Sequence, residues 1–339
     1  MAHFAQSPYF VLHQLTCQFA DGETLFGPLD LAFDRQRCGL VGRNGVGKTQ
    51  LLRLIAGRDR PGNGHVESHA ALAYVAQQPE IAADTTLAQL LGYGEVFAAL
   101  ARIEQGLPLA DDIDRLEGRW DLNDRLQSAF AAAGLPAFDP LRSACDLSGG
   151  ERMRAALCGA FLGEADYLLL DEPTNHLDSA GRAWLYQQLE RWQGGLLIAS
   201  HDRQLLGRME RIVELTPGAL RSYGGNYDGY RRQRDTEQQA ARADLEHARE
   251  ERRRTRARQQ KEHDMSQRRS AQTLRVVDTL NIASFERVAY KSAAKESLGT
   301  LRKQHQDQRD SLDAAVREAY QRVEEEQPVL LALPGSASN

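Results

Sequence analysis

A glycine-rich stretch near the N-terminus has the residue types and the spacing of a phosphate-binding loop. Residues 42–49 read GRNGVGKT, which fits G-x-x-x-x-G-K-[ST], and the stretch lies between an apolar strand-like run and an apolar helix-like run. Glycines leave backbone N–H groups free to surround phosphate oxygens, and the start of a helix attracts those oxygens. A lysine in this loop reaches the β- and γ-phosphates of a nucleotide, and a threonine hydroxyl binds Mg²⁺. The nucleotide contacts predicted here are Gly42, Asn44, Gly45, Gly47, Lys48 and Thr49.

An acidic pair follows a later apolar run. Residues 167–172 read YLLLDE, so a buried strand would place Asp171 and Glu172 at its carboxyl end. Asp171 would then lie with Thr49 on the metal side of the phosphates. Glu172 would lie one step nearer the γ-phosphate, where a carboxylate can polarise an attacking water. The pair predicts Mg²⁺-dependent hydrolysis of the nucleotide, and the alternative is an acidic pair that only ends a strand.

Residues 147–152, LSGGER, form a second anion-binding element. Ser148 and Glu151 fit a capping box, and Gly149 and Gly150 leave the backbone N–H groups of the helix start unobstructed. One nucleotide does not need two such loops from one subunit. We therefore expect this loop to close on a nucleotide held by another copy of the domain.

The elements that must position these residues alternate in type, as in α/β proteins. To about residue 230, short apolar runs alternate with amphipathic stretches. Apolar residues recur at helical spacing from residue 85 to 135, behind a capping box of Thr86 and Gln89. This pattern predicts a helical subdomain at about residues 84–165, inserted into the α/β part. The strands expected are 29–33, 38–41, 72–75, 167–170, 196–199 and 212–215.

From residue 231 to 326 the chain changes character. This segment holds no proline and a single glycine, and the strong helix formers Arg, Gln, Glu and Ala dominate it. A stripe at steps of three and four residues runs through 298, 301, 305, 308, 312, 315, 319 and 323. The stripe favours a long antiparallel helical hairpin that reverses near residues 281–291.

Composition narrows the class of protein. The 339 residues suffice for two structural units, and the mean hydropathy is −0.52. No run of about 18 apolar residues and no signal pattern occurs, so we expect no membrane domain. Cys17, Cys38, Cys145 and Cys158 fit no metal or disulfide spacing and are expected to be reduced core residues of a cytoplasmic protein. The net charge of −5 combines +8 over residues 251–303 with −13 elsewhere, which indicates an anionic partner for the basic segment.

The order of motifs resembles an ATP-binding cassette over the first 230 residues. The matching elements are GRNGVGKT, Gln77, LSGGE, YLLLDEPTNHLD and His201. The resemblance implies an α/β P-loop fold with a helical subdomain that binds ATP and Mg²⁺ and hydrolyses ATP. It also implies roles for single residues. Phe19 would stack on adenine, Gln77 would sense Mg²⁺ and the lytic water, and His201 would contact the γ-phosphate. Asp178 would couple two sites, and Ser148, Gly149 and Gly150 would bind the γ-phosphate of the opposite site.

Two further elements are similar to the F-type subfamily of cassettes. Residues 175–178 read NHLD, where membrane transporters more often have SALD, and residues 223–230 read YGGNYDGY before the charged hairpin. F-type members carry two cassettes on one chain, and many act as cytoplasmic translation factors. Their interdomain linker touches ribosomal RNA and tRNA. The resemblance thus implies the ribosome as a partner, with no membrane domain.

The basic segment gives independent support for a nucleic-acid partner. Clustered cations bind phosphate backbones with a strong dependence on salt. The cations of this segment surround most of the helix circumference, which favours a rod inserted into RNA. The alternative is that they form solvated ion pairs, such as Glu250 with Arg254. The ATPase subunit of a transporter, a DNA-associated ATPase and a linker that is only a spacer also stay open. The candidate nucleic-acid contacts are Arg252, Arg253, Arg254, Arg256, Arg258, Lys261, Arg268 and Arg269.

The last residues resemble the beginning of another domain. Residues 327–339 contain an apolar run that looks like the first strand of a second, missing cassette. A closed pair of sites needs two phosphate loops and two LSGGE loops, and this chain has one of each. We expect slow hydrolysis by the isolated cassette unless it pairs with a second one.

Overall fold

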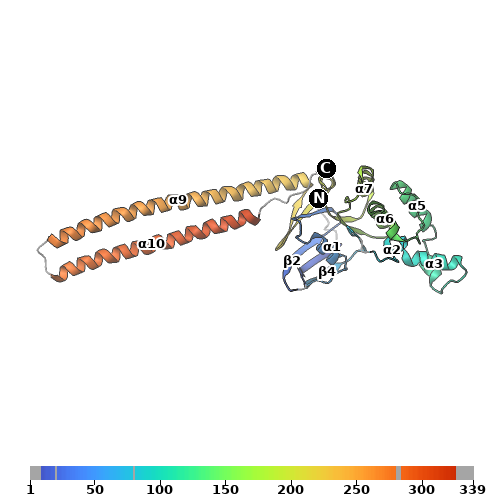
Figure 1. The fold of residues 1–339 in the computed structure, drawn as a ribbon, viewed down its shortest axis with the longest axis horizontal. Coiled ribbons are helices and arrows are strands. Elements are labelled where there is room, and N and C mark those ends of the chain that lie inside the picture. Colours follow the sequence, from blue (N-terminus) through green and yellow to red (C-terminus); the bar gives the residue numbers. More distant parts are fainter. Residues whose placement is uncertain (1–8, 20, 79–80, 280–283, 326–339) are drawn as a thin grey trace, which may run out of the picture. The chain divides into compact units, whose positions relative to one another are not determined.

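The computed structural model describes residues 9–19, 21–78, 81–279 and 284–325, without the side chains of 273–274, 276–279, 284–298, 301 and 324–325. Two compact units divide the chain, with the boundary between Tyr230 and Arg231. The predicted fold class, an α/β core followed by a long helical hairpin, is confirmed (Figure 1). The expected start of a second cassette at 327–339 lies outside the described residues, as does part of the expected reversal near 281–291.

A six-stranded sheet forms the centre of the first unit. Its strand order is β5-β6-β7-β3-β8-β9, and all neighbours are parallel except β8 and β9. Every residue of β6 and β7 is buried, which explains why both read as unbroken apolar runs. The bounds are β3 Arg37–Gly42, β5 Leu72–Val75, β6 Tyr167–Asp171, β7 Gly195–Ala199, β8 Arg211–Thr216 and β9 Ala219–Gly224.

Three further strands form a separate antiparallel sheet in the order β2-β1-β4. They are β1 (Phe10–Gln18), β2 (Thr24–Phe33) and β4 (Asn63–Ser68). Apolar residues of β1 and β2 pack with α1 (Lys48–Ile55) in one buried core cluster. The strands β1, β4 and β9 were not predicted.

The helical part lies between β5 and β6 in the chain. Its elements are α2 (Leu87–Leu90), α3 (Gly94–Glu104), α4 (Asp112–Leu116), α5 (Leu122–Ala132), the 3-10 turn η1 (Ala144–Asp146) and α6 (Gly149–Leu162). The capping box of Thr86 and Gln89 is present. The helix that it opens ends after one turn, because Gly92 adopts a left-handed conformation with φ of 82° before α3 begins.

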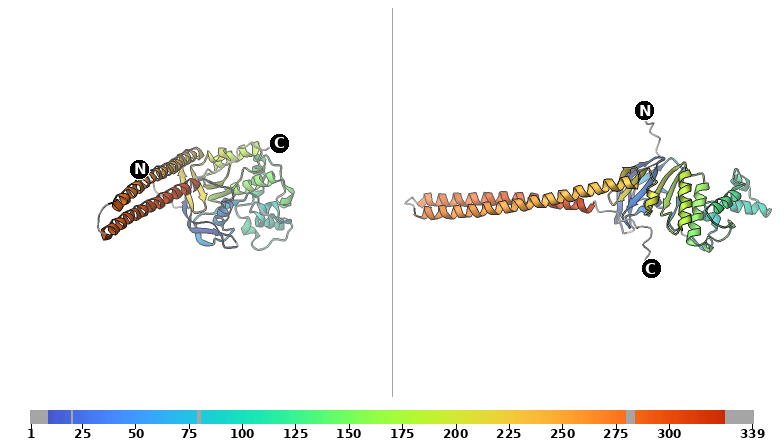
Figure 2. Two further views of the ribbon diagram at one scale, coloured as in Figure 1. Left: turned by 60° about the vertical axis from the view of Figure 1, so that its left-hand side comes forward. Right: turned by 90° about the horizontal axis from the view of Figure 1, so that it is seen from above.

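The second unit is an antiparallel pair of helices. Figures 1 and 2 show α9 (Tyr227–Thr279) and α10 (Ser284–Glu325) side by side along their length. Polar contacts hold them in one register: Arg256 with Asp313, Gln259 with Gln308, and Glu262 with His305. The expected stripe on α10 is partly wrong. Gln308 and Ala315 are exposed, and the covered positions are 305, 309, 312, 313, 316, 319 and 323, which alternate steps of four and three apart from 313.

The cysteines are only partly the core residues that were expected. Cys38 and Cys158 are buried, Cys17 is half-buried, and Cys145 is exposed. Cys145 lies in the turn η1, where local hydrogen bonds rather than core packing fix the backbone. Two further helices complete the first unit: α7 (Ser179–Arg191) follows β6 in the chain, and α8 (Arg203–Leu206) follows β7.

Candidate functional site

One pocket of about 630 Å³ gathers most of the residues predicted to contact the nucleotide. The strands β3, β5, β6 and β7 are parallel, so the loops after them meet at one edge of the sheet. Three residues without a predicted role, Leu25, Gln50 and Asn175, also line the pocket. The predicted residues that line it are Phe19, Asn44, Gly45, Gly47, Lys48, Thr49, Gln77, Asp171, Glu172 and His201.

The phosphate loop requires glycine at more than one place. Gly45 and Gly47 have φ of 80° and 101°, a region that side chains disfavour. A Cβ at Gly47 would come within 2.7 Å of the buried Phe26 ring, so a side chain there would collide with the core next to the loop. Gly42 does not line the pocket, and a Cβ on it would meet the Leu215 carbonyl oxygen at 2.8 Å. Its role is close packing at the end of β3.

The side chain of Lys48 is held in place by a backbone carbonyl group of the phosphate loop. Its Nζ donates to the carbonyl oxygen of Gly42 at 3.0 Å. Burial lowers the pKa of Lys48, and the charges of Glu172 and Asp171 oppose that shift. The ammonium group thus lies in a partly dehydrated site, where its attraction to phosphate oxygens is stronger than in water.

The two acids differ in environment although they are neighbours. Asp171 ends β6 with 1% exposure, and burial raises its pKa, while the Thr49 hydroxyl and Lys48 counteract this. Glu172 begins the next loop with a left-handed φ of 47°. Burial raises the pKa of Glu172 to about 7, against the lowering effects of the His201 backbone N–H and Lys48. A carboxyl group tuned in this way can exchange a proton near neutral pH.

His201 approaches Glu172 from the end of β7. The His201 backbone N–H donates to Oε2 of Glu172, and the imidazole Nε2 lies 3.3 Å from Oε1. The second approach lacks hydrogen-bond geometry, so Oε1 has no hydrogen-bond partner among the described residues. Burial lowers the pKa of His201, and the charge of Lys48 lowers it further, so this environment favours the neutral imidazole.

The donor atoms of the pocket suit a divalent cation bound together with a phosphate. Oδ2 of Asp171 and Oε1 of Glu172 are buried oxygens without hydrogen-bond partners, and both side chains line the pocket. No group of three His, Cys, Asp or Glu side chains in the described part forms a metal site by itself. Mg²⁺ is commonly held by one or two carboxylates plus substrate phosphates and waters. The residues therefore fit Mg²⁺ with a nucleotide.

The LSGGE loop does not line this pocket. Ser148 and Glu151 form the predicted capping box at the start of α6. Gly150 lies against the loop after β6, where a Cβ would come within 2.8 Å of the His176 carbonyl oxygen, and His176 itself has φ of 64°. The side chain of Asp178 accepts a hydrogen bond from the N–H of Gly181 and caps α7. Ser148, Gly149, Gly150 and Asp178 thus stand apart from the phosphate loop of their own chain.

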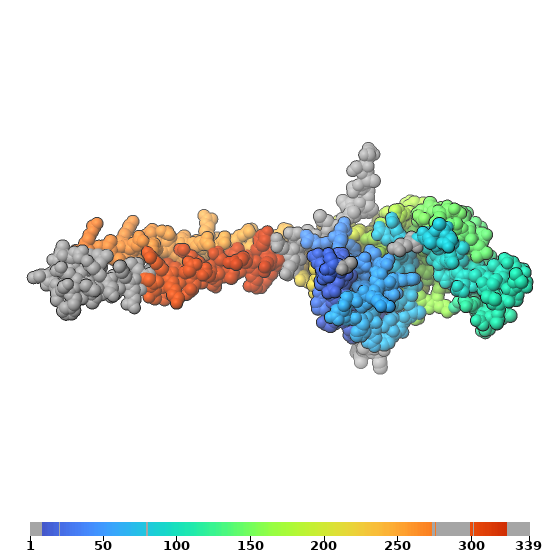
Figure 3. Space-filling model, turned by 60° about the horizontal axis from the view of Figure 1, so that its bottom comes forward, coloured from blue at the N-terminus to red at the C-terminus, as the bar shows by residue number. Residues whose placement is uncertain are grey.

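The cations of the hairpin divide into two faces of α9. Arg252 and Arg256 contact Asp313 of α10, with N–O distances of 3.2 and 3.0 Å. A second set of cations lies two residues further along the helix, which is a rotation of about 200° and therefore the opposite face. This set is Arg254, Arg258 and Lys261. Figure 3 shows side chains of α9 projecting away from α10. Cations therefore occupy both faces of α9, and the face directed away from α10 carries those that Asp313 does not hold.

Most of the cations on the outward face are well exposed. Arg254 pairs with Glu250 and Arg258 with Glu262, both at helical i,i+4 spacing, with the arginines 77% and 82% exposed. Ion pairs of this kind contribute little and are easily exchanged for another anion. Arg253, Lys261, Arg268 and Arg269 are exposed and have no ion pair within the described part of the chain.

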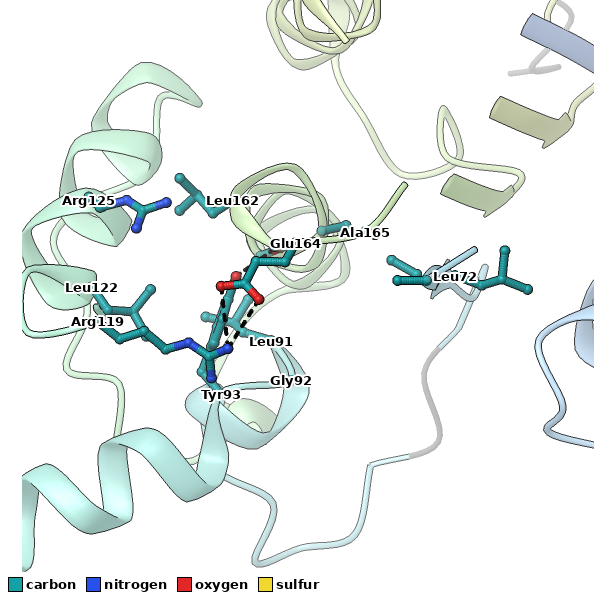
Figure 4. A pocket seen from close by; sticks show the side chains of 15 residues that line it. Leu72, Leu91, Gly92, Tyr93, Arg119, Leu122, Arg125, Leu162, Glu164 and Ala165 are labelled. Carbon is teal, nitrogen blue, oxygen red and sulfur yellow. Dashed lines mark hydrogen bonds and ion pairs between the residues drawn. The ribbon is translucent and has the colours of Figure 1, made fainter. Parts of the chain in front are cut away.

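A second cavity, of about 360 Å³, lies in the first unit between β5 and helices of the helical part. Figure 4 shows Arg119 reaching Glu164, with an N–O distance of 3.4 Å. The Tyr93 hydroxyl, also in this wall, donates to the carbonyl oxygen of Gly159. The cavity shares no lining residue with the first pocket, and its charged pair is mutually satisfied. It is not part of the phosphate site.

Comparisons with known proteins agree with this site. Residues 30–175 match the family described as ABC transporter. The energy-dependent translational throttle protein EttA of Mycobacterium tuberculosis is 37% identical over 214 residues, which are 57% of this chain and 38% of that protein. EttA of Escherichia coli K12 is 36% identical over 225 residues, 60% of this chain and 40% of the relative. The chain spans about two fifths of the length of these curated relatives.

A solved structure extends the comparison to the fold. A dimeric ATP-binding cassette in a post-hydrolysis state, bound to ADP and Pi, superposes with a TM-score of 0.50 at 22% identity, covering 63% of this chain and 98% of its own. Within the described residues, no helix combines the length and the apolar character needed to cross a membrane.

Proposed function

The chain belongs to the ATP-binding cassette family, in its F-type branch, and on that premise we propose that it is an ATPase that couples ATP binding and hydrolysis to contact with the ribosome. The observation that carries the ATPase part is one pocket that joins the phosphate loop to two buried carboxylates. Bound Mg²⁺ would neutralise phosphate charge. Lys48 and Thr49 would orient the phosphates and the metal, while Glu172 would polarise the attacking water and accept its proton.

Closure against a second cassette completes the proposal for the enzyme. Ser148, Gly149 and Gly150 stand apart from the phosphate loop of this chain, yet Ser148 caps a helix whose start can bind an anion. A second cassette, of the same or another chain, would bring this loop to the γ-phosphate, with Asp178 near the contact. An isolated cassette would then hydrolyse ATP slowly.

The ribosome is the partner that the chain's relatives and its charges favour together. The EttA relatives are named as translational throttle proteins. The outward cations of α9 suit RNA phosphates, which would include ribosomal RNA and tRNA. A cytoplasmic place of action follows from this proposal. The transporter alternative gives no role to a hairpin of two long polar helices.

Co-sedimentation with ribosomes tests the proposal. The chain with Glu172→Gln should bind ATP without hydrolysing it, and it should pellet with ribosomes at moderate salt only when ATP is present. Glu190→Gln, which alters an exposed pair with Arg208, serves as the matched control and should behave as the unmodified chain. A Glu172→Gln chain that binds ATP but stays in the supernatant would contradict the ribosome part alone. Competition by structured DNA, but not by RNA, would favour a DNA partner instead.

A further inference from the structure

A tyrosine on the strand next to Asp171 has no role in the site described so far. Tyr74 lies on β5, which runs parallel to β6, and its partner in register is Leu169. Side chains two residues apart on a strand point to the same face, so Tyr74, Leu169 and Asp171 share one face of the sheet. The Tyr74 ring packs against the core cluster that contains Leu169.

Two polar atoms on this face are buried and unsatisfied. The Tyr74 hydroxyl and Oδ2 of Asp171 both lack a hydrogen-bond partner among the described residues. A buried polar atom without a partner costs about 1–3 kcal/mol, and each such atom in a folded protein needs an explanation. An unsatisfied donor and an unsatisfied acceptor on the same face of neighbouring strands can satisfy each other.

The two groups are close enough to influence each other. Burial raises the pKa of Tyr74 far above its ordinary value, and the Asp171 carboxylate raises it further. In return, after the larger effects of burial, Thr49 and Lys48, the Tyr74 hydroxyl lowers the pKa of Asp171. The phenol therefore keeps its proton at any physiological pH and can act only as a hydrogen-bond donor to the carboxylate.

We propose that Tyr74 is a positioning residue that fixes the Asp171 carboxylate for the metal ion bound with the nucleotide. In the metal-bound site its hydroxyl would donate to one oxygen of this carboxylate and leave the other oxygen to the metal. Partners behind a metal-binding carboxylate fix its orientation, and their loss commonly weakens metal binding by about 10–100-fold. The inference rests on the proposed function, because it gives Asp171 its metal.

Removal of the single hydroxyl tests this role. For Tyr74→Phe we expect the Mg²⁺ concentration that half-maximally strengthens ATP binding to rise about tenfold, with unchanged ATP affinity in EDTA. Tyr93→Phe is the matched control, because it removes a tyrosine hydroxyl that donates to Gly159 in the other cavity. It should leave both quantities unchanged. Calorimetric titration of ATP at several Mg²⁺ concentrations measures them without any turnover.

A double-mutant cycle separates positioning from a general effect on folding. If Tyr74 acts through Asp171, then Tyr74→Phe should add nothing to Asp171→Asn in the Mg²⁺ titration. Additive effects, or a Tyr74→Phe chain with the Mg²⁺ requirement of the unmodified protein, would overturn the inference alone. No ATP binding by the unmodified chain would instead overturn the proposed function and this inference with it. A Tyr74→Phe chain that melts in EDTA at the temperature of the unmodified protein would exclude a mere packing defect.

Discussion

The backbone N–H of His201 and the imidazole of the same residue both meet the carboxylate of Glu172, at 3.3 Å from Oε2 and Oε1 respectively. These residues follow the neighbouring parallel strands β6 and β7. Sheet geometry, rather than a flexible loop, therefore sets the position of the carboxylate. A left-handed φ of 47° at Glu172 is a strained conformation of the kind that concentrates at functional sites.

Glu172→Gln should abolish most hydrolysis and spare ATP binding. The amide keeps the shape of the side chain but cannot accept a proton, so we expect phosphate release to fall by about 10²–10⁴-fold. Steady-state phosphate release and equilibrium ATP binding measure the two effects. Hydrolysis at the rate of the unmodified chain would contradict the role given to Glu172.

The same substitution should change how stability depends on pH. The folded-state pKa of Glu172 is raised from 4.5 to about 7, so folding favours its protonated form. That stability is fully present below pH 4.5 and is lost as the pH rises through 7. Relative to Glu172→Gln, the unmodified chain should lose about 2–3 kcal/mol between pH 5 and pH 8. Denaturation midpoints of both chains at the two pH values measure this, and a constant difference would show that burial does not perturb Glu172.

The two faces of α9 should respond differently when their cations are removed. Arg254, Arg258 and Lys261 replaced by glutamine should lower the slope of log affinity for RNA against log salt by about two to three. Arg252 and Arg256 replaced by glutamine should leave this slope unchanged, because both contact Asp313. Filter binding of ribosomal RNA at several salt concentrations compares the two variants. Equal salt slopes for the two variants would indicate that the outward cations contribute only to solubility.

Gln259 should matter more to the hairpin than its neighbour. It is 2% exposed, donates to Gln308 at 2.9 Å and accepts from Arg309 at 2.9 Å. Gln259→Ala removes both hydrogen bonds and leaves a gap at a buried position, and we expect a loss of about 1–3 kcal/mol. Gln260→Ala removes only an exposed i,i+4 contact with Asp264 and should cost about 0.5 kcal/mol or less. Hydrogen exchange over residues 252–262 distinguishes the two variants. Equal protection in both would show that the hydrogen bonds of Gln259 do not stabilise the hairpin.

The two glycines of the LSGGE loop should differ in their tolerance of alanine. A Cβ at Gly150 would come within 2.8 Å of the His176 carbonyl oxygen, whereas at Gly149 the nearest atom is 3.9 Å away. Gly150→Ala should therefore lower stability by about 1–3 kcal/mol, and Gly149→Ala should be close to neutral. Melting temperatures test the contrast. A Gly150→Ala chain with the melting temperature of the unmodified chain would show that the loop after β6 can shift at little cost.

Local motifs carried most of what could be predicted about the site. The phosphate loop and the acidic pair depend on glycine geometry and on a buried strand, which a short sequence determines. Asn175 was missed as a pocket residue, although its place in PTNHLD offered a signal. Tyr74 gave no signal, because its importance depends on its pairing with β6, about a hundred residues later in the chain.

Strands with weak alternation were missed for a physical reason. The strand β4 is largely exposed, and β1 contains an irregularity between Leu12 and Leu15, with Gln14 at φ of 49°. An irregularity of this kind shifts the side-chain alternation that reveals a strand. The division of the cations into two faces was equally hidden, since periodicity alone does not tell which face meets α10. The contacts of Arg252 and Arg256 with Asp313 on α10 identify that face.

The fixed register of the hairpin limits how such a protein can vary in length during evolution. The pairs Arg256 with Asp313, Gln259 with Gln308 and Glu262 with His305 descend one arm while they ascend the other. An insertion in one arm alone would displace every pair on its far side. Longer or shorter hairpins should therefore arise through insertions or deletions of equal length in both helices. Steps of about seven residues would keep each face of the helices in place.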